Sequence, residues 1–499
     1  MSVFLVTDAP QAVEAHHRVV VWLGRDHGKL PGKVTVHART PEDFLGAILE
    51  HVQPSLLENF ECALTAADTN RAVADHLLER YKYASRQASF DLNTLYWTYK
   101  ICALQTIQKI DSLPSGINTL DQLENAHRDQ ACVIIGAGPS LDISSIDPAR
   151  ILTIATTRTA RLCLDAGWCP DYIIHIDPGP FEGVLDEVMA HPKAQTARWL
   201  IPFQVHSRFT RLPGRTFWFG SRLNPSSIWI SKRVRKALRV PLIVSGGSVS
   251  CCAFTIAEFM GCSPICLLGQ DLSYGGSQKY STEEVLSDRF SSIVRDDPDI
   301  LTLPAIRGGA VQTTMDYASY AEWFVTQARH TRRKAINCTP RGVHLPGLDH
   351  LPIQKVYARY CQESRMAPAE FPTRPFPKID PRPFVGRARE VCAETKSALD
   401  RGDCARAFEL QTRLGHPDSD EYLVTGCTQY EQKILTYFVH LPVEHPKVRR
   451  CLDLLADASL HACDLVSAAL DGVIDVPPID DEDVTRRMRA ILEINAFKL

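Results

Sequence analysis

The sequence lacks the long apolar run that a membrane-spanning helix requires. No segment of the 499 residues holds the roughly 18 consecutive apolar residues that cross a bilayer. The first residues, "MSVFLVTDAPQAVEAHH", have neither the basic region nor the long apolar core of a signal peptide. We therefore predict a cytoplasmic protein with no membrane span.

An excess of positive charge and paired cysteines are also absent. The formal net charge is −3, whereas a general nucleic-acid-binding protein carries a basic surface, so we expect no nucleic-acid partner. The 16 cysteines lie scattered in apolar stretches, and none has the CxxC spacing of a zinc site. We expect buried, reduced thiols and predict no metal-ligand cluster.

Neither of the two common nucleotide-binding motifs is complete. In "CVIIGAGPSLDISS", Gly136 and Gly138 match the first two glycines of the dinucleotide fingerprint, but the third position is Leu141. The acidic residue expected about twenty residues further on is missing, and no Gly-Lys-Ser/Thr makes a P-loop. What is present is a strand leading into a glycine loop, whose N–H groups we expect to meet phosphate oxygens.

The residue pattern and composition change three times along the chain, which divides it into four segments. Residues 1–114 combine short β-like pieces with helical periodicity and predict a largely helical N-terminal α/β accessory domain. Residues 115–362 predict a central catalytic domain, and the proline-rich stretch 363–385 predicts a linker or an extended arm. Residues 386–499 predict a helical domain that opens with two helices broken at Gly402. A simple bundle and a protein-docking role both stay open for this domain.

The central part alternates short apolar runs with helical segments. Near-continuous apolar strands between helices indicate a mostly parallel sheet that is covered on both faces. We therefore predict an α/β, Rossmann-like fold. The runs are "CVIIG", "ILTIA", "DYIIHID", "RWLIPF", "TFWFG", "PLIVSGG" and "PICLLG".

Small, polar or acidic residues follow five of these runs. Since ligands of open α/β sheets bind beyond the carboxyl ends of the strands, the five loops together predict one composite ligand site. The residues are Gly136, Ala137, Gly138, Pro139 and Ser140 after the first run, Thr156 and Thr157, Asp177, then Ser245, Gly246, Gly247 and Ser248, and finally Gln270 and Asp271.

Three further features bear on the chemistry of this site. Ser248 is placed to cap a helix whose N-terminus would favour an anion, although a simple capped helix explains the pattern as well. Tyr274 and Tyr280 stand six residues apart in a glycine-containing loop, where two phenols could hydrogen-bond a leaving phosphate. We interpret His175, inside an apolar strand, as a core residue with satisfied hydrogen bonds.

The order of the motifs resembles the motility accessory factor (Maf) family of bacterial proteins implicated in flagellin glycosylation. The resemblance rests on "VIIGAGPSLD", "PDYIIHIDP", "SGGSVSCCAFTIAEFMGCSPICLLGQDLSY", "RGGAVQTTMDYASYAEWF" and "INCTPRGVHLPG", and it covers about residues 115–350. The central domain of that family is also called 6-hydroxymethylpterin pyrophosphokinase (MptE)-like. The same order is similar to bacterial CMP-sialic acid sialyltransferases, with a GT-A-related fold.

The sialyltransferase resemblance implies roles for the candidate residues. The glycine loop from Gly136 to Ser140 would hold the nucleotide, the second and third strand ends would contact nucleotide and sugar, and Tyr274 and Tyr280 would assist the leaving phosphate. Asp177 stands where those enzymes carry asparagine. Their histidine base has no counterpart in "LPAIRGGAVQTTMDY", so the general base is unassigned.

These resemblances imply a glycosyltransferase that moves a nonulosonic acid of the pseudaminic or legionaminic type from a CMP-activated donor to Ser or Thr hydroxyls of flagellin. Asp271, Tyr274 and Tyr280 would be catalytic, and no cofactor is required, although Asp177 and Asp271 could together hold Mg²⁺. Two alternatives stay open. One is a Mg-ATP-dependent pyrophosphokinase acting on a pterin alcohol, and the other is a non-catalytic flagellin-binding assembly factor.

Overall fold

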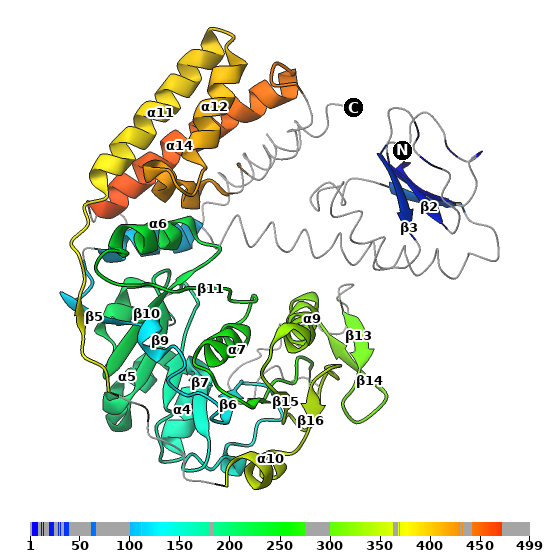
Figure 1. Ribbon diagram of the computed structural model, residues 1–499, viewed down its shortest axis with the longest axis vertical. Coiled ribbons are helices and arrows are strands. Elements are labelled where there is room, and N and C mark those ends of the chain that lie inside the picture. Colours follow the sequence, from blue (N-terminus) through cyan, green and yellow to red (C-terminus); the bar gives the residue numbers. More distant parts are fainter. Residues whose placement is uncertain are drawn as a thin grey trace. The chain divides into compact units, whose positions relative to one another are not determined.

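The computed structural model divides the chain into two compact units, residues 1–97 and residues 98–499 (Figure 1). The structure describes residues 2–7, 11, 13, 19–23, 28, 30, 34–38 and 61–65 of the first unit, and residues 100–110, 112–179, 181, 183–274, 300–362, 368, 370–429, 432 and 442–471 of the second. The helical stretches expected between 40 and 97 and after 471 lie outside the described residues.

A small parallel sheet forms the described part of the first unit. Its strands are arranged in the order β3-β2-β1-β4, and all three pairings are parallel. Strands β1 and β3 are the two β-like pieces expected from the sequence, whereas β2 and β4 were not predicted. The bounds are β1 Ser2–Thr7, β2 Val19–Leu23, β3 Val34–Ala38 and β4 Glu61–Thr65.

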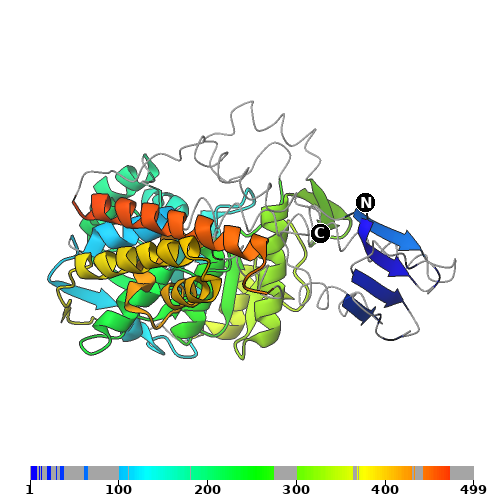
Figure 2. The same cartoon turned by 90° about the horizontal axis from the view of Figure 1, so that it is seen from above.

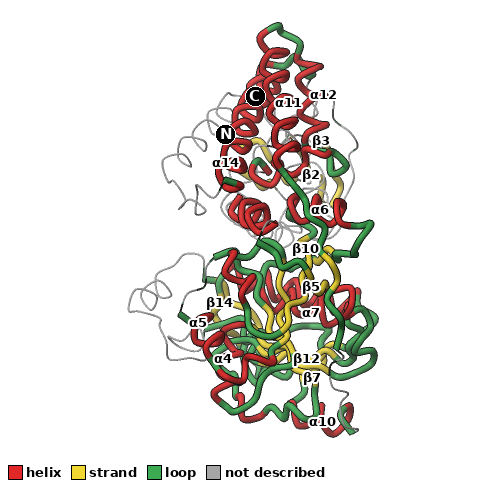
Figure 3. Tube along the Cα trace, turned by 90° about the vertical axis from the view of Figure 1, so that its left-hand side faces the viewer, coloured by secondary structure: helices red, strands yellow, loops and turns green. Residues whose placement is uncertain are grey.

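An eleven-stranded sheet lies at the centre of the second unit, and Figure 3 shows its strands gathered between the helices. The order is β16-β15-β12-β6-β7-β8-β9-β10-β5-β17, with β11 paired to β10. Every pairing is parallel except that of β17 with β5, which confirms the predicted α/β fold with a mostly parallel sheet.

The strands of the large sheet are β5 Gly116–Thr119, β6 Cys132–Ile135, β7 Leu152–Thr156, β8 Tyr172–Ile174, β9 Arg198–Pro202, β10 Arg215–Ser221, β11 Leu242–Ile243, β12 Ile265–Leu268, β15 Ala335–Asn337, β16 Asp349–His350 and β17 Arg374–Pro375. A separate antiparallel hairpin consists of β13 Leu301–Pro304 and β14 Ala310–Thr313. The main helices are α4 Thr157–Asp165, α5 Val184–Ala190, α6 Pro225–Val234, α7 Val249–Phe259, α9 Met315–His330, α10 Ile353–Tyr360, α11 Arg382–Asp400, α12 Cys404–Leu414 and α14 Pro446–Leu470.

Alternate residues of each central strand enter different cores. In β6, Val133 and Ile135 belong to one buried cluster, whereas Cys132 and Ile134 belong to the other. Because side chains alternate across a strand, the two clusters lie on opposite faces of the sheet. Helix α7 supplies the second cluster, and both faces are therefore covered, as continuous apolar strands require.

The proline-rich stretch forms an extended arm along one edge of the sheet. Its short strand β17 pairs antiparallel with β5, and Arg374 donates to the carboxylate of Asp121 at 3.0 Å. The carbonyl oxygen of Phe371 accepts a hydrogen bond from the Asn118 amide at 3.3 Å. Prolines suit such an arm because they lock φ and donate no ladder hydrogen bonds.

The C-terminal helices pack together and on the sheet domain (Figure 2). Helices α11 and α12 are separated at Gly402, whose φ of +79° ends the first helix, as the sequence predicts. The link to the sheet domain is a 3-10 segment, η7 (Asp420–Cys427), which contacts α6. There Trp229 donates its indole N–H to the Asp420 carbonyl oxygen at 2.8 Å.

Candidate functional site

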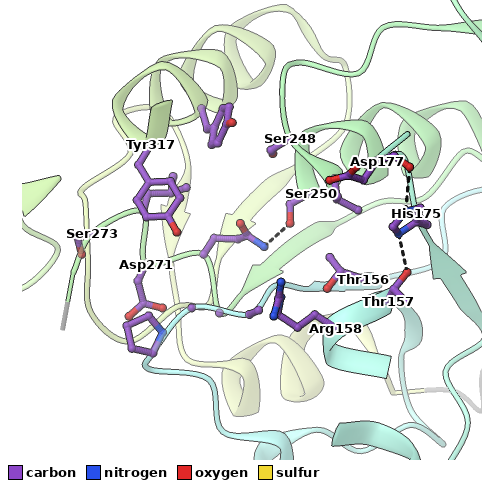
Figure 4. A pocket seen from close by; sticks show the side chains of 18 of the residues that line it. Thr156, Thr157, Arg158, His175, Asp177, Ser248, Ser250, Asp271, Ser273 and Tyr317 are labelled. Atoms are coloured by element: carbon purple, nitrogen blue, oxygen red, sulfur yellow. Dashed lines mark hydrogen bonds between the residues drawn. The ribbon is translucent and has the colours of Figure 1, made fainter. Parts of the chain in front are cut away.

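A pocket of about 260 Å³ opens beyond the carboxyl ends of β6, β7, β8 and β12 (Figure 4). The start of α7 and helix α9, which carries Tyr317 and Tyr320, contribute further walls. The pocket lies at the sheet edge where the five strand-end loops predict a ligand site.

Two helix N-termini contribute to this one pocket. Helix α4 begins after Thr156, whose hydroxyl accepts from the Thr159 amide, and helix α7 begins after Ser248, whose hydroxyl accepts from the Cys251 amide at 3.1 Å. The first amides of a helix have no acceptor within the helix, and the helix dipole adds positive potential there. The residues that carry those amides line the pocket in both helices: Thr157 and Arg158 in α4, Val249 and Ser250 in α7.

The glycine loop after β6 is bound to the loop after β12. The amides of Gly136 and Gly138 donate to the carbonyl oxygens of Leu268 and Gly269, each at 2.8 Å. The Ser140 amide donates to Oδ1 of Asp271 at 3.1 Å. The amides of Gly136 and Gly138, which the sequence predicts to meet phosphate oxygens, therefore already have protein acceptors.

Close packing between two protein loops explains instead why glycine occupies positions 136 and 138. A Cβ at Gly136 would collide with the Gln270 side chain and lie 2.7 Å from the Gly269 carbonyl oxygen. A Cβ at Gly138 would collide with the Asp271 carboxylate. The absent side chains thus let residues 269–271 pack against the glycine loop, and this close approach is between two protein segments rather than between protein and ligand.

Asp271 is a buried carboxyl group that binds the glycine loop. Burial raises its pKa to about 6, although the hydrogen bonds from Ser140 act in the opposite direction. Its Oδ2 atom has no hydrogen-bond partner within the described part of the chain. The neighbouring Gln270 donates to the Ser250 hydroxyl at 2.7 Å, which links the β12 loop to the start of α7.

His175 is a buried neutral imidazole on the opposite side of the pocket. Burial lowers its pKa to about 4. Its Nδ1 lies 3.1 Å from the Thr157 hydroxyl and its Nε2 lies 3.0 Å from the Asp177 carbonyl oxygen. The interpretation as a core histidine with satisfied hydrogen bonds fits these contacts, but the same residue also lines the pocket.

The structure brings most of the predicted residues to this pocket and leaves others outside it. Those that line it are Ala137, Gly138, Pro139, Thr156, Thr157, Asp177, Ser248, Gln270 and Asp271. Gly136, Ser140, Ser245, Gly246, Gly247 and Tyr274 are not among its lining residues. Tyr280 lies outside the described residues.

Physical reasons account for the residues that do not line the pocket. The ring of Tyr274 packs on that of Tyr317, with centroids 5.9 Å apart, and its hydroxyl lies 3.4 Å from the Thr314 hydroxyl. Gly246 and Gly247 have φ values of +62° and +85°, and any side chain at them would meet Trp323 or Tyr320 of α9. These glycines form the turn that lets α9 approach the start of α7.

Six polar or aromatic residues of the pocket were not predicted from the sequence, namely Arg158, Phe181, Ser250, Ser273, Tyr317 and Tyr320. Tyr317 and Tyr320 stand three apart in "MDYASYAEW", a spacing that puts both on one helix face, but nothing local indicates that this face meets the site. Arg158 and Ser250 are second residues of helices that begin at strand ends, which was a usable signal. Phe181 follows a proline-glycine turn and gave none.

Two negative findings apply to the described part of the chain. No three His, Cys, Asp or Glu side chains are grouped there so that they could hold a metal ion. No helix there is long and apolar enough to cross a membrane.

Comparisons with known proteins agree with the fold and the motifs. Residues 104–277 match the family model described as 6-hydroxymethylpterin diphosphokinase MptE-like. No curated protein matches the sequence. Among solved structures, the chain is similar to the structure of the MAf glycosyltransferase from Magnetospirillum magneticum AMB-1, with 16% identity and a TM-score of 0.56 over 92% of this chain and 73% of that one. An MptE-like central domain and the fold of a Maf glycosyltransferase thus confirm the resemblance that the motifs predicted.

Proposed function

We propose that this chain is a glycosyltransferase that moves a nonulosonic acid, of the pseudaminic or legionaminic type, from its CMP-activated donor to Ser or Thr hydroxyls of flagellin. The acceptor and the sugar come from the resemblance to Maf proteins and sialyltransferases. The nature of the donor has support from the pocket itself.

The observation that carries this proposal is the meeting of two helix N-termini at one pocket. A CMP-nonulosonate has two anionic groups on the same anomeric carbon, namely the sugar carboxylate and the phosphate that joins it to cytidine. The starts of α4 and α7 each favour one anion, through the amides of the first helical turn and the helix dipole. Two neighbouring anion sites fit such a donor better than they fit an uncharged sugar.

The proposed reaction requires stabilisation of the negative charge that develops on the phosphate. As the acceptor oxygen bonds to the anomeric carbon, the bond from that carbon to the phosphate oxygen breaks and CMP leaves with an additional negative charge. Positive potential aimed at this charge lowers the barrier. The phenols of Tyr317 and Tyr320 line the same pocket and are suited to donate hydrogen bonds to it, the role that the sequence analysis gave to Tyr274 and Tyr280.

A second candidate function follows from the family model, whose description is a diphosphokinase. Such an enzyme would bind Mg-ATP, and Asp177 and Asp271 are the carboxylates of the pocket that could face the metal ion. A third candidate, a flagellin-binding factor without catalysis, would need no nucleotide at all.

Ligand-induced thermal stabilisation of the full chain separates the three candidates. CMP at a hundred times its Kd should add about 2.7 kcal/mol to the free energy of unfolding. We expect a higher melting temperature with CMP, and not with Mg-ATP or NAD. A rise with Mg-ATP alone would favour the diphosphokinase, and no rise with any nucleotide would favour the binding factor.

A matched pair of variants locates the binding. Ala137 lines the pocket, whereas Ala149 is exposed in the turn that precedes β7, at the opposite edge of the sheet. We expect Ala137→Leu to abolish the stabilisation by CMP and Ala149→Leu to retain it. Transfer of sugar from CMP-pseudaminate to purified flagellin, followed by mass spectrometry of the intact flagellin, then tests the reaction.

A further inference from the structure

A column of side chains in contact with one another leads from the protein core to the pocket. The rings of Phe209 and His175 are stacked with centroids 4.3 Å apart. The ring of His175 lies 4.8 Å from that of Phe181, and the guanidinium carbon of Arg158 lies 5.6 Å from the centroid of Phe181. Phe209 is fully buried at the inner end, and Arg158 lines the pocket at the outer end.

Arg158 is the cationic end of this column. The Asp177 carbonyl oxygen can only accept a hydrogen bond, so Nε2 of His175 carries a proton. Burial lowers the pKa of His175 to about 4, so at pH 7 the imidazole is neutral and does not repel the guanidinium, while the ring of Phe181 attracts it. The column brings one positive charge to the pocket, and Figure 4 shows Arg158 extended below the centre of the site.

The helix dipole makes the position of Arg158 an unusual place for a cation. Arg158 is the second residue of α4, where the helix dipole favours negative charge and opposes positive charge. Phe181, which packs beneath it, adopts a left-handed φ of +49°, a conformation that is costly for a bulky residue. A cation at a helix N-terminus and a strained backbone, found together at one pocket, indicate a ligand-binding role.

Arg158 is also the one Lys or Arg among the described residues that line the pocket. The other charged residues there are Asp177 and Asp271, which would repel an anionic ligand. Among the described residues that line the pocket, Arg158 is therefore the one side chain whose positive charge could balance an anion bound at the start of α4.

We propose that Arg158 binds the phosphate of the nucleotide donor and stabilises the charge that grows on it as CMP departs. This inference rests on the proposed transferase function. In the step concerned, the acceptor oxygen bonds to the anomeric carbon and its proton passes to a carboxylate of the pocket. The electron pair of the broken carbon–oxygen bond goes to the phosphate, which changes from a singly charged diester to a doubly charged monoester.

Two ligands that differ only in this charge test the assignment. CMP represents the departed phosphate, and cytidine 5′-(methyl phosphate), a diester, represents the phosphate before departure. We expect the wild-type protein to bind CMP about tenfold more tightly than the diester at pH 7.5, the gain of one charge-assisted contact. Isothermal titration calorimetry gives both dissociation constants.

The variant Arg158→Met should bind the two ligands equally, because it lacks the guanidinium that would interact with the additional negative charge of CMP. Arg158→Lys should keep part of the preference. Arg161→Met is the matched control, since Arg161 is three residues further along α4 and pairs with Asp165 and Glu187. It should preserve the wild-type ratio. Unliganded melting curves check that each variant is folded.

The possible failures are distinguishable. If the wild-type protein binds neither ligand, the proposed transferase function fails. If the wild-type protein prefers CMP and Arg158→Met keeps the same preference, the assignment of Arg158 is overturned while the transferase function stands. A purely structural role for Arg158 predicts this second result, with both ligands weakened by the same factor.

Discussion

At the scale of single residues, Asp271 makes stability depend on pH. Its pKa in the folded protein is about 6, above the ordinary value of an aspartate, because burial disfavours the carboxylate. The folded state therefore holds the proton more tightly than the unfolded state, and the contribution of this group to stability decreases as pH rises from about 4 to about 6.

The variant Asp271→Asn removes that titration, and its stability relative to wild type should rise by roughly 2 to 3 kcal/mol between pH 4 and pH 7. Urea unfolding of both proteins at several pH values measures the difference. A difference that stays constant across this range would show that Asp271 titrates alike in the folded and unfolded states.

Lys109 is a second buried group whose charge is costly. It is fully buried in the helical segment 100–110, and its amine has no hydrogen-bond partner among the described residues. Burial lowers its pKa well below the ordinary value. Lys109→Met keeps the apolar stem and removes the amine, so it should raise the free energy of unfolding by about 1 to 3 kcal/mol at pH 7.

The sign of the pH effect adds a check on Lys109. Since the folded pKa is lowered, the penalty shrinks as pH rises towards the unfolded value, and the gain from Lys109→Met should be smaller at pH 10 than at pH 7. Lys355→Met, at an exposed position on α10, should change stability by less than about 0.5 kcal/mol. A lower melting temperature for Lys109→Met would mean that the amine has a partner in the rest of the chain.

The sequence indicated which residue types follow the strands, but not which atoms face the pocket. Ser140 is in the predicted loop, yet its amide turns to Asp271 because a buried carboxylate is the stronger acceptor nearby. The strand-end position of Arg158 was a usable signal, but its contact with Phe181, which lies on another segment, could not be predicted. Such contacts form only after the strands are ordered in the sheet.

At the scale of elements, the glycine loop after β6 offers a test of why its glycines are needed. Gly136→Ala places a methyl group against Gln270 and a carbonyl oxygen, so strand β6 or the β12 loop has to shift. We expect a loss of more than about 2 kcal/mol in the free energy of unfolding. Gly386→Ala, inside α11 with no atom within 4 Å of the new methyl group, should instead stabilise by up to about 1 kcal/mol.

Chemical unfolding of the two alanine variants measures both effects. If Gly136→Ala kept wild-type stability but lost nucleotide binding, the glycine would serve close approach of a ligand, as the sequence analysis assumed. Equal losses in both variants would indicate a general effect of replacing glycine rather than packing between the two loops.

Elements with both faces buried were the most predictable part of the fold. "CVII" and "YII" are continuous apolar runs because helices cover both sides of the sheet there, and each forms a strand. By contrast, β5 and β17 at one edge read "GINT" and "RP", which carry no such signal. Their pairing is fixed by tertiary contacts of the proline-rich arm with Asn118 and Asp121.

At the scale of the second unit, the C-terminal helices and the sheet share one hydrophobic core. Leu423 and Val424 of η7 belong to the same buried cluster as Val133 of β6 and Trp229 of α6. The sequence separated these parts at the proline-rich stretch, and that division stays a prediction. A change of composition marks where the chain leaves one layer, but it does not reveal whether the next layer packs back on the first.

This shared core predicts that the sheet and the C-terminal helices unfold together. Leu423→Ala removes a fully buried side chain at their junction and should cost about 2 to 5 kcal/mol. Leu452→Ala, in the separate cluster formed by α11, α12 and α14, tests the coupling from a position away from the sheet. Amide hydrogen exchange should show that each variant lowers protection in β6–β8 by as much as in α11 and α14, because one cooperative unit opens as a whole. If Leu452→Ala lowered protection in the helices alone, the helices would be an independent domain docked on the sheet. In that case the surface between α6 and η7 would be an interface between domains rather than part of one core.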